Sequence, residues 1–310
     1  MSDELILLQE KTKTLTISEF RYNHNHGKDG RFTAGSGGGS GGGSGSGSGG
    51  GSESAAEAVR SSTENVRKNL MSNEHSPIPK EAINMAEVKR RGDLTDEEAE
   101  ECVRIAETIF SEASAKEPII TDDVVSSVSE VGGEMCRLKN RLKQPTSLAG
   151  KIGADAKQDN ASFAEASAEE KSVFFAEAGA KLKDTVRYTA VIEDADFTEG
   201  YRGIKASLER KGYREVRCKN FWEKYYSTGY DRSEQKAVQC VYEDKSGFKF
   251  ELQFHTPTSQ GAKELNHPLY NKRREETTSA DTKKALTAQM REYGAHVPDP
   301  KGVMTIKAHG

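Results

Sequence analysis

Apolar and polar residues follow two different periods along this chain, first a helical spacing and later the spacing of strands. From Thr95, which is placed to cap a helix, apolar residues recur every three to four positions and predict an amphipathic helix over 96–115. Pro118 is expected to end this helix, and Thr121 to begin a second one. A polar stretch before them predicts one loose helix near 54–70. The pattern therefore indicates a helical N-terminal flank.

Beyond residue 180, β-branched and aromatic residues predominate, as is typical of strands. Strands are predicted over 184–192, 214–222, 237–243 and 248–256. The last two flank a short DKSG turn and so should form a hairpin. Helices are predicted over 197–212, 258–275 and 281–293. This order predicts an α/β (α+β) fold, with a mixed β-sheet of about five strands flanked by helices.

A stretch of Gly and Ser alone, residues 35–52, divides the chain, because such a sequence cannot bury apolar surface and behaves as a flexible tether. We expect five parts: a polar tail (1–34), the Gly/Ser linker (35–52), a helical flank (53–117), a folded domain (118–275), and a C-terminal helix and tail (276–310). Because the 35–52 tract is too rich in Gly to pack, a chain beginning near residue 90 should fold and keep full activity.

Composition narrows the classes of function. The formal net charge of -4 argues against a broad, non-specific nucleic-acid binder, although it permits a local basic patch. No apolar run is long enough to span a membrane, so no membrane partner is expected. The four cysteines show no CxxC spacing and are interpreted as reduced, buried thiols of a cytoplasmic protein.

The strand FELQFHT carries one candidate site. Side chains alternate along a strand, so Glu251, Gln253 and His255 share one face, opposite the apolar residues between them. A carboxylate, an amide and an imidazole could together form a site. The alternative is an ordinary solvated outer face of a sheet.

The run CRLKNRLKQPTSLAGK carries a second candidate, a phosphate site. Basic residues recur at every second position, at Arg137, Lys139, Arg141 and Lys143. After Pro145, Ser147 is placed to cap a helix that carries Lys151. A helix N-terminus with basic side chains nearby binds phosphates well. The alternative is a charged, solvated helix face.

Two further positions have a possible role in ligand binding. Asp184, at the start of a predicted strand and near these basic residues, could bind Mg²⁺; the alternative is a turn residue. Tyr230, in the loop TGYDRS, could stack on a nucleotide base; the alternative is a partly buried loop anchor, and Tyr225 and Tyr226 compete for the same role.

In chain order these segments resemble a known family. RLKQPTSLAGK (141–151) resembles the RxKxxxSxxxK motif of the RelA/SpoT-type alarmone synthetases, FELQFHT resembles their E-x-Q-x-R-T strand, and AKELNHPLY (262–270) resembles their AE-x-x-H-x-x-Y helix. The resemblance covers about half of the chain, and three motifs in fixed order are more specific than one. Separately, the segment HGKDGRFTAG resembles a short HG-x-x-GRF-x-x-G stretch of some phage head and portal-associated proteins.

The synthetase resemblance implies a RelA/SpoT-like pyrophosphokinase that uses ATP and Mg²⁺. It implies that the ATP phosphates are held by Arg141, Lys143, Ser147 and Lys151. Asp184 and Glu251 would be the catalytic, metal-binding carboxylates, and Glu251 would also help to deprotonate the attacking hydroxyl. The acceptor side would comprise Tyr230, stacked on the base, and Gln253, His255 and His267, which would position acceptor phosphates or support the site.

Three departures from the family pattern concern the acceptor. Arg187 comes two positions early in its strand, His255 replaces an arginine, and the Gly-Tyr loop lacks the usual Ser and His. A guanine nucleotide is the favoured acceptor; the alternatives are the 3′ end of tRNA, or an inactive fold serving as a phage structural or interaction protein. A growth-inhibiting, phage-associated toxin is the implied role. It would act in the cytoplasm of a bacterial host or travel with a virion, with an antitoxin or a phage head protein as partner.

Overall fold

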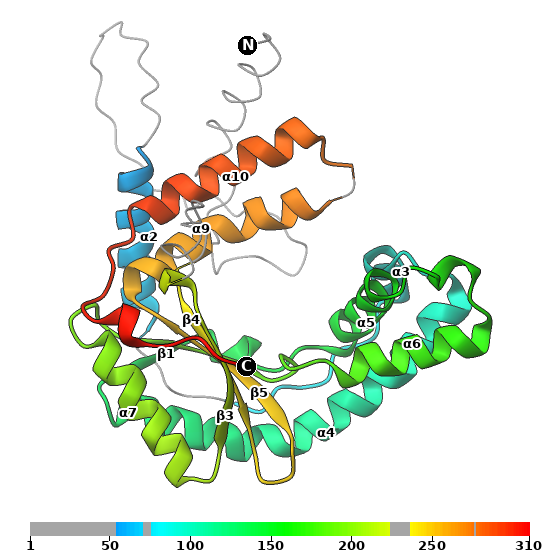
Figure 1. Ribbon diagram of the computed structural model, residues 1–310, viewed down its shortest axis with the longest axis horizontal. Helices are drawn as coiled ribbons and strands as arrows, with labels where there is room; N and C mark the ends of the chain where they lie inside the picture. Colours follow the sequence, from blue (N-terminus) through cyan, green and yellow to red (C-terminus); the bar gives the residue numbers. More distant parts are fainter. Residues whose placement is uncertain (1–53, 71–75, 224–235, 276) are drawn as a thin grey trace, which may run out of the picture.

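A five-stranded mixed sheet forms the centre of the protein, with helices around it (Figure 1). The computed structural model describes residues 54–70, 76–223, 236–275 and 277–310. The strands are β1 (Glu134–Cys136), β2 (Arg187–Val191), β3 (Arg214–Asn220), β4 (Val238–Glu243) and β5 (Lys249–His255), in the order β1-β2-β5-β4-β3. The expected mixed α/β (α+β) class is confirmed.

Helices surround this sheet on several sides. They are α2 (Ala55–Asn69), α3 (Met85–Gly92), α4 (Asp96–Ser129), α5 (Pro145–Asp159), α6 (Ala168–Ala180), α7 (Phe197–Arg210), α9 (Pro257–Arg274) and α10 (Ala280–Ala295). In Figure 1, α9 and α10 lie at the top, α3, α5 and α6 at the right, and α4 runs beneath the strands.

Pairing in the sheet agrees with the hairpin expected from sequence. β4 and β5 are antiparallel, while β5 pairs in parallel with β2, with Arg187 opposite Glu251. The predicted strands appear within about three residues of their expected bounds. β1 was not predicted, because only three residues pair with β2, too few to show a periodic pattern.

The core lies between the sheet and the pair α4 and α7. Phe250, Leu252 and Phe254 of β5 are fully buried on this face. Tyr201 of α7 meets Phe254 edge to face, with ring centroids 5.1 Å apart, and Tyr188 of β2 meets Phe250 at 5.9 Å. Each buried side chain of this size stabilises the fold by about 1.5–3 kcal/mol. The opposite face of β5, which carries the polar residues, is thereby fixed in register.

Helix α4 runs without interruption through Pro118, so the prediction that Pro118 ends one helix and Thr121 begins another is wrong. A proline inside a helix loses one hydrogen bond and costs about 3 kcal/mol. Here Ile120, Val124 and Val128 continue the buried face beyond the proline, and their burial offsets that cost. The expected boundary between flank and domain, at residues 117 and 118, therefore falls inside a continuous helix.

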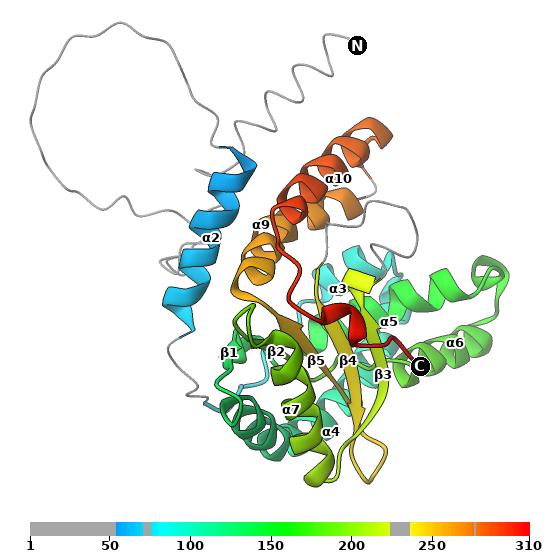
Figure 2. The same ribbon diagram turned by 60° about the vertical axis from the view of Figure 1, so that its left-hand side comes forward.

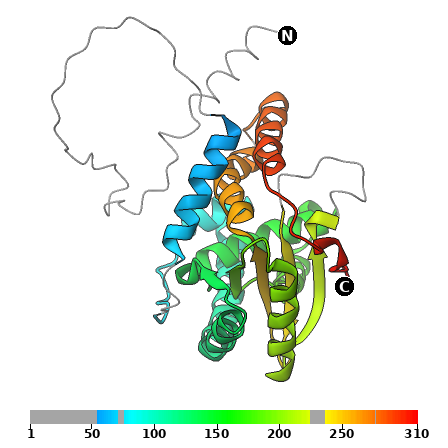
Figure 3. The ribbon, with the colours of Figure 1, turned by 90° about the vertical axis from the view of Figure 1, so that its left-hand side faces the viewer.

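Helix α2 packs along α9, as Figures 2 and 3 show. Gly261 of α9 permits this approach, because a Cβ there would lie 2.9 Å from the backbone nitrogen of Thr63. The hydroxyl of Ser62 donates to the carbonyl oxygen of Gly261 at 3.0 Å. The helix expected near 54–70 is confirmed, and it belongs to the folded body.

Two expectations from composition can be compared with the described residues. None of the described helices combines the length and apolar character needed to cross a bilayer. All four cysteines are free thiols, of which Cys102, Cys218 and Cys240 are buried and Cys136 is half-buried.

Candidate functional site

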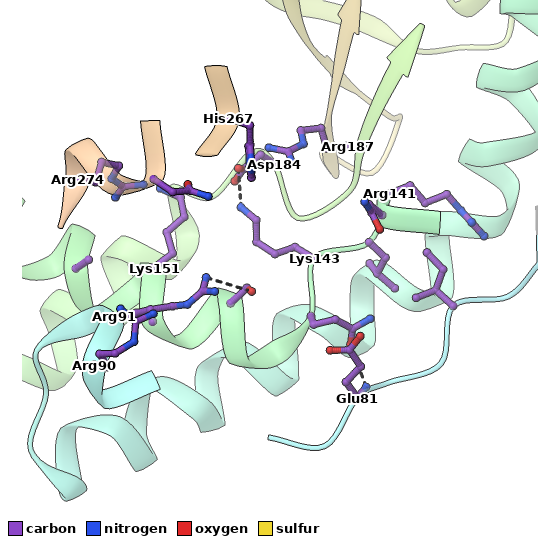
Figure 4. A pocket seen from close by; sticks show the side chains of 18 of the residues that line it. Glu81, Arg90, Arg91, Arg141, Lys143, Lys151, Asp184, Arg187, His267 and Arg274 are labelled. Carbon is purple, nitrogen blue, oxygen red and sulfur yellow. Dashed lines mark hydrogen bonds and ion pairs between the residues drawn. The ribbon is translucent and has the colours of Figure 1, made fainter. Parts of the chain in front are cut away.

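A cavity of about 1570 Å³ lies between α3 and α5 on one side and the C-terminal half of α9 on the other (Figure 4). Basic side chains outnumber acidic ones in its wall. The basic residues are Arg90, Arg91, Lys139, Arg141, Lys143, Lys151, Arg187 and Arg274; the acidic ones are Glu81, Asp93, Asp155, Asp184 and Glu275. This excess of positive charge favours an anionic ligand.

The N-terminus of α5 opens onto this cavity. Its N-cap is Gln144, whose side chain makes no capping hydrogen bond, and Pro145 occupies the first helical position. Ser147 therefore lies inside the first turn, and the expectation that it caps the helix is wrong. Ser147 and Lys151 are four residues apart and so share one face of α5, and both line the cavity. An uncapped helix N-terminus beside basic side chains is a site where phosphate binds readily.

Lys143 and Asp184 form an ion pair within the cavity, with Nζ and Oδ2 2.6 Å apart (Figure 4). Burial alone would raise the pKa of Asp184, but the charge and hydrogen bond of Lys143, with Lys151 and Arg187, lower it. Burial also lowers the pKa of Lys143, and the Asp184 carboxylate opposes that change. Both groups are therefore held charged mainly by each other, and either could exchange its partner for a ligand.

Arg141 is buried, whereas its expected role, to hold the ATP phosphates, requires a guanidinium that a ligand can reach. Its guanidinium is only 3% exposed and forms an ion pair with Glu117. It also donates to Thr121 Oγ1 at 3.1 Å and to the carbonyl oxygens of Leu138 and Ser76 at 3.0 and 2.9 Å. Its donors are thus engaged inside the protein. The geometry is that of a residue that positions the cavity wall, not of one that contacts a phosphate.

The polar face of β5 is arranged as a hydrogen-bonded chain. The Gln253 amide donates from Nε2 to Glu251 Oε1 at 2.5 Å. Lys263 of α9 donates to Gln253 Oε1 at 2.6 Å and lies 3.3 Å from His255 Nε2. Glu251, Gln253 and His255 are all buried, so the three residues expected on one face are brought together beneath α9.

Arg187 and His267 connect this polar face to the cavity. Both line the cavity, and Arg187 is directly opposite Glu251 in the parallel pairing of β2 and β5. His267 comes from α9, and Figure 4 shows it above Asp184. Partial desolvation, followed by the charges of Arg137 and Lys263, lowers the pKa of His267, which favours its neutral form. Glu251 thus lies one strand away from the cavity wall.

Sequence reasoning missed Arg90 and Arg91, although both line the cavity. A Cβ on Gly150 would lie 2.7 Å from that of Arg91, so glycine lets α3 pack closely on α5. Arg91 Nη1 then lies 3.4 Å from Ser147 Oγ. No local signal identifies such residues, since basic residues on a short helix are usually solvated.

Lys263 was missed as well, but a signal for it exists. It lies four residues before His267 on α9, so the two share one face of the helix.

Tyr230, the expected base-stacking residue, lies outside the described residues, as do Tyr225 and Tyr226.

A group of potential metal ligands elsewhere has a structural explanation. Ligand atoms of Glu215, Cys218 and Cys240 lie within 4.8 Å of one another, and none of these residues lines the cavity. The Glu215 carboxylate already pairs with Lys205 at 2.8 Å and with His309 at 3.0 Å, and it accepts hydrogen bonds from Tyr201 and Tyr242. This network fastens the C-terminal tail to β3.

Comparisons with known proteins add little to this geometry. No family model and no curated protein matches the sequence. A solved structure described as the complex between the Type VI effector Tas1 and its immunity protein contains a similar chain, with a TM-score of 0.37 and 16% sequence identity. The match covers 61% of this chain and 95% of that chain. A likeness of this degree carries no argument about activity, so function is inferred from the site itself.

The role of Arg141 can be tested through stability. The variant Arg141→Met leaves the Glu117 carboxylate buried without its partner, so the free energy of unfolding should fall by about 3–5 kcal/mol. The double variant Arg141→Met/Glu117→Gln removes both charges and should recover part of that loss. Denaturant unfolding measures both. Unchanged stability with weakened ATP binding would instead indicate a direct phosphate contact.

The role of Lys143 can be tested through binding. On the expectation from the sequence motifs that ATP phosphates bind here, Lys143→Met should weaken the binding of a non-hydrolysable ATP analogue by about tenfold or more, because a charge-assisted hydrogen bond is worth ~1.5–3 kcal/mol. The control is Lys183→Met, which removes the same charge from an exposed position next to Asp184 that does not line the cavity. Calorimetric titration of both variants decides whether the effect is local.

The cavity wall also changes the expectation for truncation. Part of the wall comes from residues before and within α3. A chain that begins near residue 90 therefore loses most of α3 and five residues of the wall, Ser76, Pro77, Ile78, Pro79 and Glu81. We expect this chain to bind the ATP analogue at least ~10-fold more weakly, a loss of ~1.4 kcal/mol or more. A chain that begins at Ser54 keeps the wall and should bind normally. Equal affinity in both would restore the view of 53–117 as a dispensable flank.

Proposed function

We propose that this protein is a pyrophosphokinase that transfers the β,γ-pyrophosphate of ATP to the 3′-hydroxyl of a guanine nucleotide. The observation that carries the proposal is the juxtaposition in one region of the basic cavity at the start of α5, the Lys143–Asp184 pair, and the neighbouring Arg187 and Glu251. The order of the three sequence motifs supports the same conclusion.

The ATP phosphates would lie at the open N-terminus of α5. There the first-turn amides and the helix dipole favour negative charge. Lys143 enters this region directly before α5, and Lys151 and Ser147 project from its first turns. Lys151 pairs with Asp155 at 2.6 Å, a half-buried contact that a phosphate could replace.

The two candidate carboxylates fit a magnesium ion by their chemistry. Mg²⁺ is usually held by one or two carboxylates, with phosphates and water completing the octahedron. Lys143 engages Oδ2 of Asp184, and Gln253 engages Oε1 of Glu251, so each carboxylate keeps a second oxygen for a metal. When bound, the ion would neutralise negative charge on the transferring phosphates.

The residues of the site would act mainly by positioning and by electrostatics. The acceptor 3′-oxygen forms a bond to the β-phosphorus of ATP, and its proton passes to the Glu251 carboxylate. The bond between the β-phosphorus and the oxygen that bridges it to the α-phosphorus breaks. The electrons of that bond stay on the oxygen, which leaves as part of the phosphate of AMP. Lys143, Lys151 and Arg187 would stabilise the charge that develops.

The distribution of basic residues bears on the alternative acceptor, tRNA. Lys205, Arg210, Lys211 and Arg214 are ion-paired with acidic neighbours and do not line the cavity. Lys272, Arg273 and Arg274 form the last turn of α9, and Arg274 lines the cavity. That turn is the one observation in favour of tRNA, whose 3′ end could follow it into the site. A free nucleotide needs less basic surface and remains our first choice.

An enzyme of this kind consumes ATP and a guanine nucleotide together, so unchecked activity would stop growth. We therefore propose a toxin role, with an antitoxin protein as a partner of the active chain. The proposed phage association rests on the short segment near residue 30, which lies outside the described residues.

The decisive experiment supplies ATP labelled at the β and γ phosphates with GDP, GTP, ADP, ATP or bulk tRNA as separate acceptors. We expect label in GDP or GTP. Glu251→Gln keeps the size of the side chain but removes the charge, so transfer should fall by at least ~100-fold, the usual scale for acid–base catalysis. Chromatography of the products measures both.

The matched control is Glu243→Gln, the same change on the neighbouring strand β4 outside the cavity. It should transfer like the unaltered protein. Label in tRNA alone would replace the nucleotide acceptor by tRNA. Label in no acceptor, with ATP binding intact, would favour an inactive fold with a structural or interaction role.

A further inference from the structure

Lys263 occupies a position that neither the motifs nor the proposed mechanism assigns. It projects from α9 onto the polar face of the sheet, where its ammonium contacts both Gln253 and His255. The charges of Arg187 of β2 and Arg137, which follows β1, lower the pKa of Lys263, and the Glu251 carboxylate opposes them. These contacts distinguish Lys263 from a lysine that is simply solvated at the surface, and they indicate a role in the site.

The hydrogen bonds around Lys263 have a defined direction. An ammonium can only donate, so its bond to Oε1 fixes the Gln253 amide with its NH₂ group toward Glu251. Lys263 therefore fixes, through Gln253, that an N–H donor faces the Glu251 carboxylate. The same ammonium faces Nε2 of His255, and Nδ1 of that ring lies 3.0 Å from Ser259 Oγ. If Nε2 accepts from Lys263, Nδ1 carries the proton and donates to Ser259.

His255 cannot supply positive charge in this arrangement. It is 1% exposed, and burial, followed by the charge of Lys263, holds its pKa well below the usual range. The E-x-Q-x-R-T pattern has an arginine at this strand position, and an arginine would always be charged. The ammonium of Lys263 lies 3.3 Å from Nε2 of the imidazole ring.

We infer that Lys263 takes the part of the missing strand arginine: it positions Glu251 through Gln253, and it supplies the positive charge that receives a phosphate of the acceptor, with His255 as its support. This inference rests on the proposed function, because it assigns the acceptor side of the same site. Burial, with Arg187 and Arg137, lowers the pKa of Lys263 to about 7, and an incoming phosphate would relieve that unfavourable crowding of charge.

The test compares three variants in the labelled-ATP assay, with GDP as acceptor. Lys263→Met should lower kcat/KM for GDP by about 100-fold, on the scale of a positioned catalytic group. Lys263→Arg keeps the charge, so its kcat/KM for GDP should remain within about tenfold of that of the unaltered protein. The double variant His255→Arg/Lys263→Met returns an arginine to the strand. Its kcat/KM for GDP should be at least ~10-fold higher than that of Lys263→Met alone, which corresponds to about 1.4 kcal/mol. The control is Lys284→Met, an exposed lysine of α10 with no such contacts.

A binding measurement separates this inference from the proposed function. Calorimetric titration with inorganic pyrophosphate needs no transfer, and Lys263→Met should bind it about tenfold more weakly than the unaltered protein. If the unaltered protein transfers label to no acceptor, the proposed function fails, and this titration alone decides the role of Lys263. Full activity of Lys263→Met, or equal pyrophosphate affinity, would overturn the inference. If Lys263→Met fails to fold, activity in Lys263→Arg but not in Lys263→Gln supports it, and equal activity in these two overturns it.

Discussion

Arg141 and Glu117 form a buried ion pair that joins α4 to the segment leading into α5, and the geometry of the cavity depends on it. A buried pair is tolerated only when its remaining donors are satisfied, and here Thr121, Leu138 and Ser76 accept them. The backbone of Arg141 then pairs with β2, since its carbonyl oxygen accepts from Arg187 N at 2.7 Å. The side chain and the backbone of one residue thus connect the core helix, the sheet and the cavity wall.

This connection explains how a basic segment meets an acidic residue that is 41 positions away. Lys143 N donates to the carbonyl oxygen of Thr185 at 2.9 Å, which aligns the residues before α5 with the start of β2. The Lys143 side chain is therefore held against Asp184. Lys143 and Asp184 stabilise each other's charge. A ligand that separates them must therefore bring a negative group for Lys143 and a positive group for Asp184, as a complex of a metal ion with a polyphosphate does.

The second half of the site depends on packing on the opposite side of the same strand. Phe250, Leu252 and Phe254 are fixed in the core by aromatic contacts with β2 and α7, which leaves no freedom for β5 to shift its register. The polar residues between them must then face α9, where Lys263 completes their hydrogen bonds. In this way the apolar core determines the orientation of a polar site that it does not contact.

The sequence by itself determined four of the five strands, the β4–β5 hairpin, the shared face of Glu251 and Gln253, and the order of the basic and acidic motifs, because each can be seen in a short stretch of the chain. It could not determine that α4 continues through Pro118, since burial of Ile120 and Val124 beyond the proline offsets a local cost. Nor could it separate Arg141 from Lys143, which are equivalent as basic residues two positions apart. Both residues line the cavity, but only the tertiary structure buries the guanidinium of Arg141 against Glu117 and pairs Lys143 with Asp184, because the environment of a charge depends on partners that are distant in the chain.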